Sequence, residues 1–138
     1  CRRPAVGLSR TAGGGGVTGF SLRRLLARPY RSIGPAEAAA LLGQGAILLD
    51  VREHAEWRAG HAPKARHVPL ARLPGHLRHL PERRLVVTVC RSGARSGRAA
   101  ALLARDGRSV ANLAGGMRAW QRAGLPVVAA GGGVGVVA

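Results

Sequence analysis

Cysteine is scarce in this chain: Cys1 and Cys90 are the only two among 138 residues. So small a number excludes the disulfide framework of a small secreted domain, and neither cysteine belongs to a C-x-x-C pair that would bind a metal or exchange electrons. Only Cys90 lies within a stretch of regular hydrophobic pattern. A single thiol of this kind fits a reducing compartment, so we expect a cytoplasmic protein without a metal site.

Aromatic and acidic residues are also few. Aromatic side chains make up 3% of the chain, which leaves Leu, Val, Ile and Ala to build the core and few rings to stack on bases. Six acids stand against 22 lysines and arginines, a formal net charge of +16. Such a charge is compatible with nucleic acid, a membrane surface or anionic substrates. Because the arginines are scattered, we favour biased codon usage in a GC-rich genome and expect no nucleic acid partner.

The two ends of the chain lack the pattern of a folded domain. Residues 1–29 contain a GGGG run and no acid, which predicts a disordered basic tail or leader. Organelle targeting is the alternative, because transit peptides are also Arg-rich and poor in acids. Residues 129–138 are expected to form a Gly/Val-rich C-terminal tail. No stretch reaches the ~20 apolar residues of a spanning helix, so we expect no membrane span. The start at Cys1 instead of Met predicts a processed chain or a fragment.

Between these ends, short apolar runs alternate with helical patterns. The runs at 46–51 and 84–89 are nearly continuous, which is typical of strands buried on both faces of a sheet. The alternation predicts an α/β fold with a parallel sheet. The expected strands are 46–51, 65–70, 84–89 and 109–113, and the expected helices are 34–45, 53–60, 73–81, 96–107 and 116–124.

Cys90 directly follows the strand at 84–89 and opens a cationic turn into the next helix. Ligands of parallel sheets bind at the carboxyl ends of strands, which is where this thiol is placed. Gly93 can take a positive φ, so the N–H groups of the turn can point inward as an anion-binding nest beside the positive end of the helix. Arg91 and Arg95 add formal charge. A cysteine in such surroundings can have a pKa of ~3.5–7.5, so we expect a nucleophilic thiolate.

Three motifs occur in order: LLDVREHAEWRAGHAP (48–63), CRSGARS (90–96) and LAGGMRAWQRAGLPV (113–127). The second resembles the active-site loop of rhodanese-family sulfurtransferases. The others are similar to the family's Asp-x-Arg…Glu…Gly-His-Ile-Pro pattern and to its closing Gly-Gly…Trp…Gly-Leu-Pro-Val segment. The resemblance covers about residues 30–128, which we interpret as one rhodanese-like domain. The chain departs from the pattern at Ala62, where Ile is usual, and at Lys64, where Gly is usual; these departures concern the local turn.

The resemblance implies an α/β domain with a central parallel sheet, helices on both faces, and a thiosulfate sulfurtransferase activity that needs no cofactor. Cys90 would attack the outer sulfur of a donor such as thiosulfate and then hold a persulfide. Cyanide or a thiol would accept the sulfur, and a protein thiol is a further candidate acceptor. Arg91 and Arg95 would bind the sulfonate end of the donor. The full anion loop would comprise Arg91, Ser92, Gly93, Ala94, Arg95 and Ser96, supported by Asp50 and Arg52 with Glu56 as a candidate partner.

Two other functions stay open on the sequence alone. Phosphatases and arsenate reductases of this architecture use a loop of Cys, five residues and Arg, whereas four residues separate Cys90 from Arg95. The shorter loop favours sulfur over a tetrahedral phosphate. A regulatory or carrier module that holds a persulfide without turnover would need the same cysteine, so the sequence does not separate it from an enzyme.

The remaining conspicuous residues are expected to have structural roles. Trp57 and Trp120 are predicted to anchor the core, and Gly115 and Gly116 to allow a tight strand-to-helix turn. His61 is expected to bond to the backbone. The other histidines form no metal-binding constellation and are expected at the surface; they are His54, His67, His76 and His79.

Overall fold

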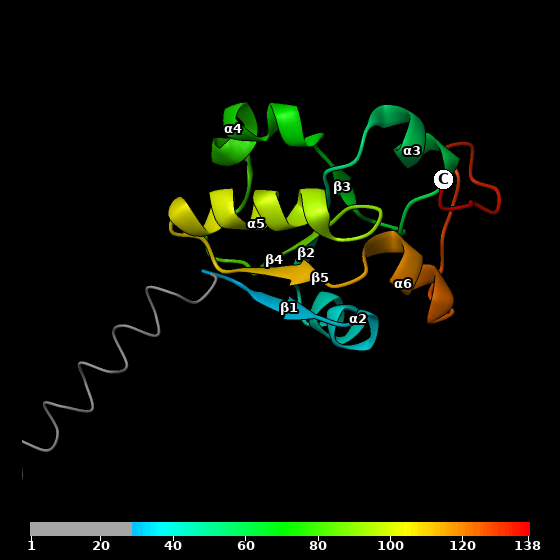
Figure 1. Cartoon of the computed structure of the whole chain (residues 1–138), viewed down its shortest axis with the longest axis horizontal. Helices are drawn as coiled ribbons and strands as arrows, with labels where there is room; N and C mark the ends of the chain where they lie inside the picture. The colour runs from blue at the N-terminus through cyan, green and yellow to red at the C-terminus, as the bar shows by residue number, and fades with distance from the viewer. Residues whose placement is uncertain (1–28) are drawn as a thin grey trace, which may run out of the picture.

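The computed structural model describes residues 29–138 (Figure 1). The tail or leader predicted for residues 1–29 therefore lies outside the described residues, apart from its last one. Helices and strands alternate along the described chain, as the apolar pattern predicts. In chain order they are β1 Arg31–Ile33, α2 Pro35–Gly43, β2 Ile47–Asp50, α3 His54–Ala59, β3 Arg66–His67, the 3-10 helix η2 Leu70–Arg72, α4 Leu73–His76, the 3-10 helix η3 Leu77–His79, β4 Val86–Val89, α5 Ala94–Arg105, β5 Val110–Leu113 and α6 Gly116–Arg122.

The five strands form one parallel sheet in the order β1-β5-β4-β2-β3. Every residue of β2, β4 and β5 is buried, because helices cover both sides of these strands. The register pairs Asp50 of β2 with Val89 of β4, so the chain leaves both strands at the same carboxyl edge. The predicted α/β fold with a central parallel sheet is confirmed.

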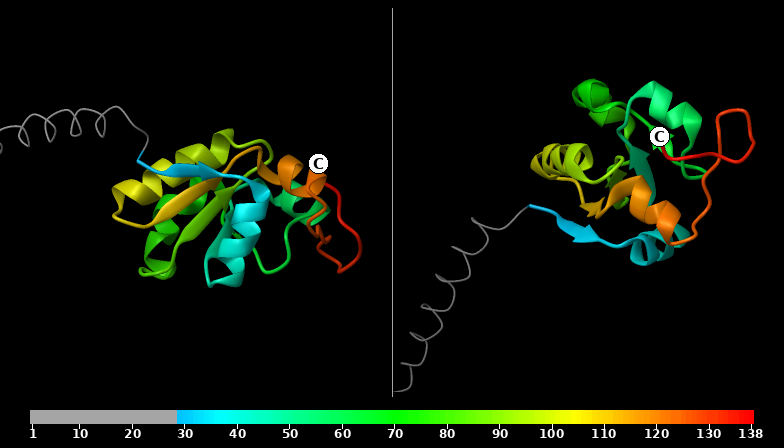
Figure 2. Two further views of the ribbon diagram at one scale, coloured as in Figure 1. Left: turned by 90° about the horizontal axis from the view of Figure 1, so that it is seen from below. Right: turned by 45° about the vertical axis from the view of Figure 1, so that its right-hand side comes forward.

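Helices lie on both faces of this sheet, as Figures 1 and 2 show. On one face, α4 and α5 contribute Leu73 and Leu103 to a cluster that also contains Cys90. On the other face, α2 and α6 contribute Ala38 and Trp120 to a second cluster. Successive residues of a strand point to opposite faces. The position of Cys90 in the first cluster therefore directs its side chain toward α5.

The sheet contains one strand that was not predicted, and one helix beside it begins earlier than predicted. The strand β1 was not predicted, because it is an edge strand in which only the last residue, Ile33, is buried. The helix α5 begins at Ala94, two residues before the predicted start at 96. It begins there because Gly93, with a φ of 114°, closes the turn in a conformation that a residue with a side chain rarely adopts.

The segment after β2 is also less regular than predicted. The strand expected over 65–70 is reduced to the two residues of β3. The helix expected over 73–81 is a succession of short α and 3-10 turns. Pro74 lacks a backbone N–H and Gly75 has a low helix propensity, so neither favours a continuous helix there.

The Gly/Val-rich segment that was predicted as a C-terminal tail folds back beside α3. Val128 and Val134 form an isolated antiparallel bridge, and the N–H of Val136 donates to the carbonyl of Ala59 at 2.9 Å. A Cβ at Gly60 would collide with the backbone of Val136, so the two segments are in close contact. Within residues 29–138, no helix has the length and apolar character needed to cross a membrane.

Candidate active site

Cys90 lies at the carboxyl end of the central strand β4 and begins the loop that leads into α5. Strands β2 and β5 flank β4, so their carboxyl ends lie on either side of the loop. Only 1% of Cys90 is exposed, and it packs in the same cluster as Ala99 and Leu103 of α5. The structure therefore places the thiol at the predicted edge of the sheet, largely withdrawn from bulk water.

Hydrogen bonds from the loop point at the Cys90 sulfur. The N–H of Gly93 donates to Sγ at 3.1 Å, and the hydroxyl of Ser96 donates to Sγ at 3.3 Å. Burial alone raises the pKa of the thiol, because a thiolate is poorly stabilised away from water. Hydrogen bonds from the Ser96 hydroxyl and from the backbone N–H groups of Ser96, Gly93 and Ser92 outweigh burial and lower the pKa of Cys90 below its ordinary value of 9.0. The loop thus stabilises the thiolate, which is the nucleophilic form.

The N-terminus of α6 holds the outer carbonyl groups of the loop. The N–H of Met117 donates to the carbonyl of Cys90 at 2.7 Å. The N–H of Arg118 donates to the carbonyl of Arg91 at 3.1 Å. This contact requires a glycine, because Gly116 has a φ of 60° and a Cβ there would collide with the backbone of Cys90 and Arg91. The tight turn predicted at the glycine pair is confirmed, and it brings α6 against the loop.

Two buried polar side chains beneath the loop were not predicted. Thr88 in β4 donates from its hydroxyl to the carbonyl of Ser96 at 3.0 Å. Asn112 in β5 donates from Nδ2 to the carbonyl of Gly93 at 3.2 Å. The two residues are direct neighbours in the β4–β5 register. The signal for them was available in the sequence, because a polar residue inside an otherwise apolar strand must find a hydrogen-bond partner.

Arg95 forms a bidentate ion pair with Glu56 of α3. Its Nη1 and Nη2 atoms donate to the two carboxylate oxygens at 2.7 and 2.8 Å. The bond from Arg95 is the largest influence on the Glu56 carboxyl and lowers its pKa from 4.5 to about 2. In return, the carboxylate raises the pKa of Arg95. Glu56 was a candidate partner of Asp50 and Arg52; the charge of Arg52 also helps to lower its pKa, but its hydrogen-bonded partner is Arg95, so it fixes α3 to the loop.

Asp50 and Arg52 pair with each other at the end of β2. Arg52 Nη2 donates to Asp50 Oδ2 at 2.7 Å, and both side chains are 0% exposed. The same Nη2 atom also donates to the carbonyl of Gly60 at 2.7 Å, which ties the two ends of the α3 segment together. The Nη1 atom of Arg52 is buried without a hydrogen-bond partner among the described residues. The pair therefore supports the loop indirectly, by fixing the segment that carries Glu56.

The other predicted loop residues lie at the surface of the loop. Arg91, Ser92 and Ala94 are exposed. Within the part of the chain that the structure describes, no hydrogen bond or ion pair involves the Arg91 guanidinium. Arg91 thus differs from Arg95, whose guanidinium is occupied by Glu56.

The aromatic predictions are confirmed in part. Trp120 is buried, and its Nε1 donates to the carbonyl of Pro126 at 2.8 Å. Trp57 is half-buried and lies outside the two core clusters, so its predicted place in the core is wrong. It stacks on His61 with ring centroids 3.6 Å apart. His61 is held as predicted, with Nδ1 2.8 Å from the backbone carbonyl of Trp57.

Comparisons with known proteins agree with this geometry. A family model described as Rhodanese-like domain matches residues 34–123. The chain is 45% identical over 84 residues to a protein named sulfurtransferase in Allochromatium vinosum, a match that covers 60% of this chain and 78% of the relative. It is 34% identical over 93 residues to a thiosulfate sulfurtransferase of Pseudomonas fluorescens, which covers 67% of this chain and 85% of the relative. A solved rhodanese-related protein from Thermoplasma volcanium superposes with a TM-score of 0.68 at 29% identity, covering 72% of this chain and 98% of that one.

Proposed function

This chain belongs to the rhodanese-like domain family, and we propose that it is a sulfurtransferase that works through a persulfide on Cys90. The donor is thiosulfate or a similar sulfane sulfur compound, and the acceptor is a thiol or cyanide. The observation that carries the proposal is the set of hydrogen bonds at Cys90 Sγ. These bonds lower the pKa of the thiol, although its burial alone would raise that pKa. Such a thiolate suits covalent catalysis in two steps.

In the first step, the Cys90 thiolate attacks the outer sulfur of thiosulfate. A bond forms between Sγ and that sulfur while its bond to the sulfonate sulfur breaks, and sulfite leaves with the electron pair. The outer sulfur of the resulting persulfide lies about 2 Å from Sγ. The N–H groups that stabilise the thiolate are placed to stabilise negative charge on this persulfide as well.

Arg91 is the residue that we assign to the sulfonate end of the donor. It is exposed and lies next to the nucleophile, and guanidinium groups bind oxyanions well. Arg95 was an equal candidate on the sequence, but Glu56 occupies both of its terminal nitrogens. We therefore assign Arg95 to positioning the loop through α3.

The proposal is tested by the intact mass of the protein after thiosulfate treatment and desalting. We expect one added sulfur that cyanide removes as thiocyanate, and no addition in Cys90→Ser, whose hydroxyl cannot form a persulfide. Arg91→Ala should raise KM for thiosulfate roughly tenfold, the loss of one hydrogen bond to a charged group. The matched control is Arg98→Ala, an exposed arginine on α5 outside the loop. An unmodified mass after thiosulfate would refute the sulfurtransferase assignment.

The same experiment separates the proposal from two alternatives. A persulfide that forms and then reacts only once, without repeated thiocyanate release in excess thiosulfate and cyanide, would indicate a carrier module. A phosphatase or arsenate reductase would hydrolyse a phosphate ester or reduce arsenate without acquiring the added sulfur. The loop argues against these anions, because four residues instead of five separate Cys90 from Arg95 and Glu56 already binds the Arg95 guanidinium.

A further inference from the structure

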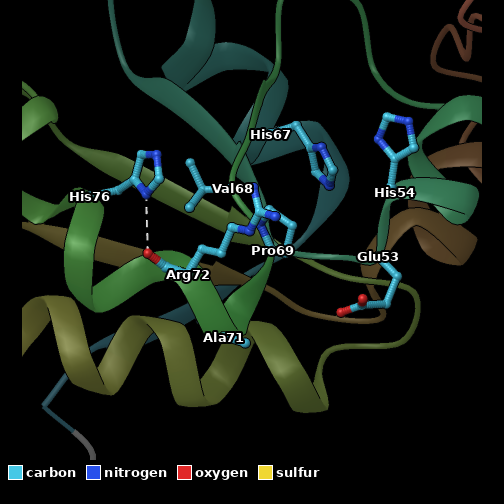
Figure 3. A pocket seen from close by; sticks show the side chains of 8 residues that line it. All are labelled: Glu53, His54, His67, Val68, Pro69, Ala71, Arg72 and His76. Carbon is cyan, nitrogen blue, oxygen red and sulfur yellow. Dashed lines mark hydrogen bonds between the residues drawn. The ribbon is translucent and has the colours of Figure 1, made fainter.

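A pocket of about 360 Å³ lies at the carboxyl ends of β2 and β3, lined by residues of α3, η2 and α4 (Figure 3). Two observations relate it to the loop that carries Cys90. Val68 in its wall belongs to the same core cluster as Cys90. The backbone N–H of Glu53 at its rim donates to Glu56 Oε1 at 3.0 Å, and the same oxygen accepts from Arg95 of the loop at 2.7 Å. The pocket therefore adjoins the active-site loop on the face of the sheet toward which Cys90 points.

The lining of this pocket favours an anion. Arg72 extends across it toward Pro69, and no hydrogen bond or ion pair of the described residues involves the Arg72 guanidinium (Figure 3). The imidazoles of His54, His67 and His76 line the same space, against the single carboxylate of Glu53. Within residues 29–138, no three His, Cys, Asp or Glu residues are grouped to hold a metal ion. Among the described residues, no hydrogen bond involves the His54 imidazole, so this ring is free to donate to a ligand beside Arg72.

Two of these imidazoles are held in place by the backbone. His67 Nε2 lies 2.7 Å from the carbonyl of Arg52, and His76 Nδ1 lies 3.1 Å from the carbonyl of Arg72. A carbonyl can only accept, so the nitrogen facing it carries the proton. Apolar side chains of Val68, Pro69 and Ala71 complete the lining. The pocket thus offers a cationic group, fixed rings and an apolar wall to a small organic anion.

Thiosulfate does not need this space, because it is a small anion that must reach Cys90 itself. We propose that the pocket binds the carboxylate of a small organic thiol, with Arg72 as the binding residue, while the thiol of that molecule accepts the sulfur. This inference rests on the proposed function and names the class of its acceptor. It predicts that acceptor thiols are selected by the carboxylate they carry.

The transfer itself balances without a further reactant. The acceptor thiol passes its proton to the outer sulfur of the Cys90 persulfide, and the resulting thiolate attacks that sulfur to form a new S–S bond. The bond between Sγ and the outer sulfur breaks, and Cys90 leaves as the thiolate with the electron pair. The proton stays on the outer sulfur, so the product is the hydropersulfide of the acceptor. The hydrogen bonds that lower the pKa of Cys90 make it a good leaving group in this step.

The test uses protein loaded with thiosulfate, freed of excess donor and mixed with a graded series of thiols. The series is 2-mercaptoethanol, 3-mercaptopropionate and mercaptosuccinate, and the readout is the rate at which the added sulfur leaves the protein. For Arg72→Gln we expect the half-saturating concentration of mercaptosuccinate to rise three- to tenfold, with a much smaller change for 2-mercaptoethanol. The ratio of the variant to the parent value is taken for each thiol separately, so the intrinsic reactivity of that thiol cancels. The matched control is Arg78→Gln, an exposed arginine of η3 that does not line the pocket.

Two further comparisons test the inference, and the second, succinate binding, does so even if loading fails. Ala71→Glu adds a carboxylate to the pocket at an exposed position. It should raise the half-saturating concentration of mercaptosuccinate more than Ala71→Gln does. Succinate, which has no thiol, should shift the imidazole NMR signals of the unloaded protein, and Arg72→Gln should weaken this effect while Arg78→Gln does not. Equal behaviour of the Arg72 and Arg78 variants in both assays would overturn the inference. Succinate binding without persulfide formation would instead refute the proposed function and leave the anion pocket standing.

Discussion

The ion pair between Glu56 and Arg95 gives a quantitative prediction, because it fixes α3 to the loop that follows Cys90. The perturbation is Glu56→Gln, which keeps the shape of the side chain and removes its charge. Its pKa in the folded protein is about 2, against an ordinary value of 4.5. One pKa unit corresponds to about 1.4 kcal/mol, so the shift sets an upper bound of about 3 kcal/mol. The side chains are 20% and 29% exposed, so water screens the pair and we expect about 1–2 kcal/mol at pH 7.

The sign of the pH dependence follows from the lowered pKa. The folded protein holds the Glu56 proton less tightly than the unfolded chain does, so the pair stabilises the fold fully above about pH 5. As the pH falls from 4.5 toward 2, the carboxylate gains its proton and the contribution is lost. The difference in free energy of unfolding between the parent chain and Glu56→Gln should therefore shrink over that range.

The assay is urea unfolding followed by circular dichroism at a series of pH values. Glu37→Gln is the matched control, because Glu37 also pairs with an arginine, Arg31, but at 49% and 62% exposure. A surface pair of that kind contributes about 0–1 kcal/mol. If Glu56→Gln costs no more than Glu37→Gln at pH 7, or if its cost is the same at pH 2, the structural role given to this pair is refuted.

Two other predictions concern the thiol and one strained residue. Ser96→Ala removes the hydroxyl that bonds to Sγ, so the pKa of Cys90 should rise and the pH at which alkylation by iodoacetamide accelerates should move upward. Ser92→Ala should shift that pH less, because only the backbone N–H of Ser92 acts on the sulfur. Lys64 has a φ of 66°, a left-handed conformation that costs a non-glycine residue about 1–2 kcal/mol. Lys64→Gly should therefore raise the free energy of unfolding by roughly 0.5–1 kcal/mol in urea titrations, whereas Lys64→Ala keeps the strain, and an equal result for both would contradict this explanation.

The turn at Lys64 shows how sequence and structure inform each other. The sequence departs from the family pattern at this position, and we expected the departure to affect the local turn. The structure shows how this turn is built. Pro63 and Lys64 occupy the corner of a turn closed by the N–H of Ala65 and the carbonyl of Ala62 at 3.2 Å. Such a turn favours proline first and a residue with positive φ second, which glycine adopts without strain.

The sequence predicted the parts of the candidate site that are local in the chain. The position of Cys90 after a buried strand, the turn at Gly93 and the helix that follows are encoded within one continuous stretch, so pattern and turn chemistry were sufficient. The partner of Arg95 was not predictable in this way. Glu56 is 39 residues away, and only the packing of α3 against the loop brings the two charges together. The composition showed that acidic residues are few, but it could not predict which arginine each of them binds.

The anion-binding character of the loop is likewise a property of the fold and not of residues 90–96 alone. Three loop carbonyls, those of Cys90, Arg91 and Gly93, accept hydrogen bonds from α6 and from Asn112. These bonds hold the carbonyl oxygens away from the sulfur, where their partial negative charge would destabilise a thiolate. The N–H groups of the turn are then left to face Sγ. We infer that Asn112 and the N-terminus of α6 help to stabilise negative charge on Cys90 Sγ without touching it. A strand-to-helix turn that carried CRSGARS without these partners would lack the fixed carbonyls, and we infer that its cysteine would keep a pKa nearer the ordinary value.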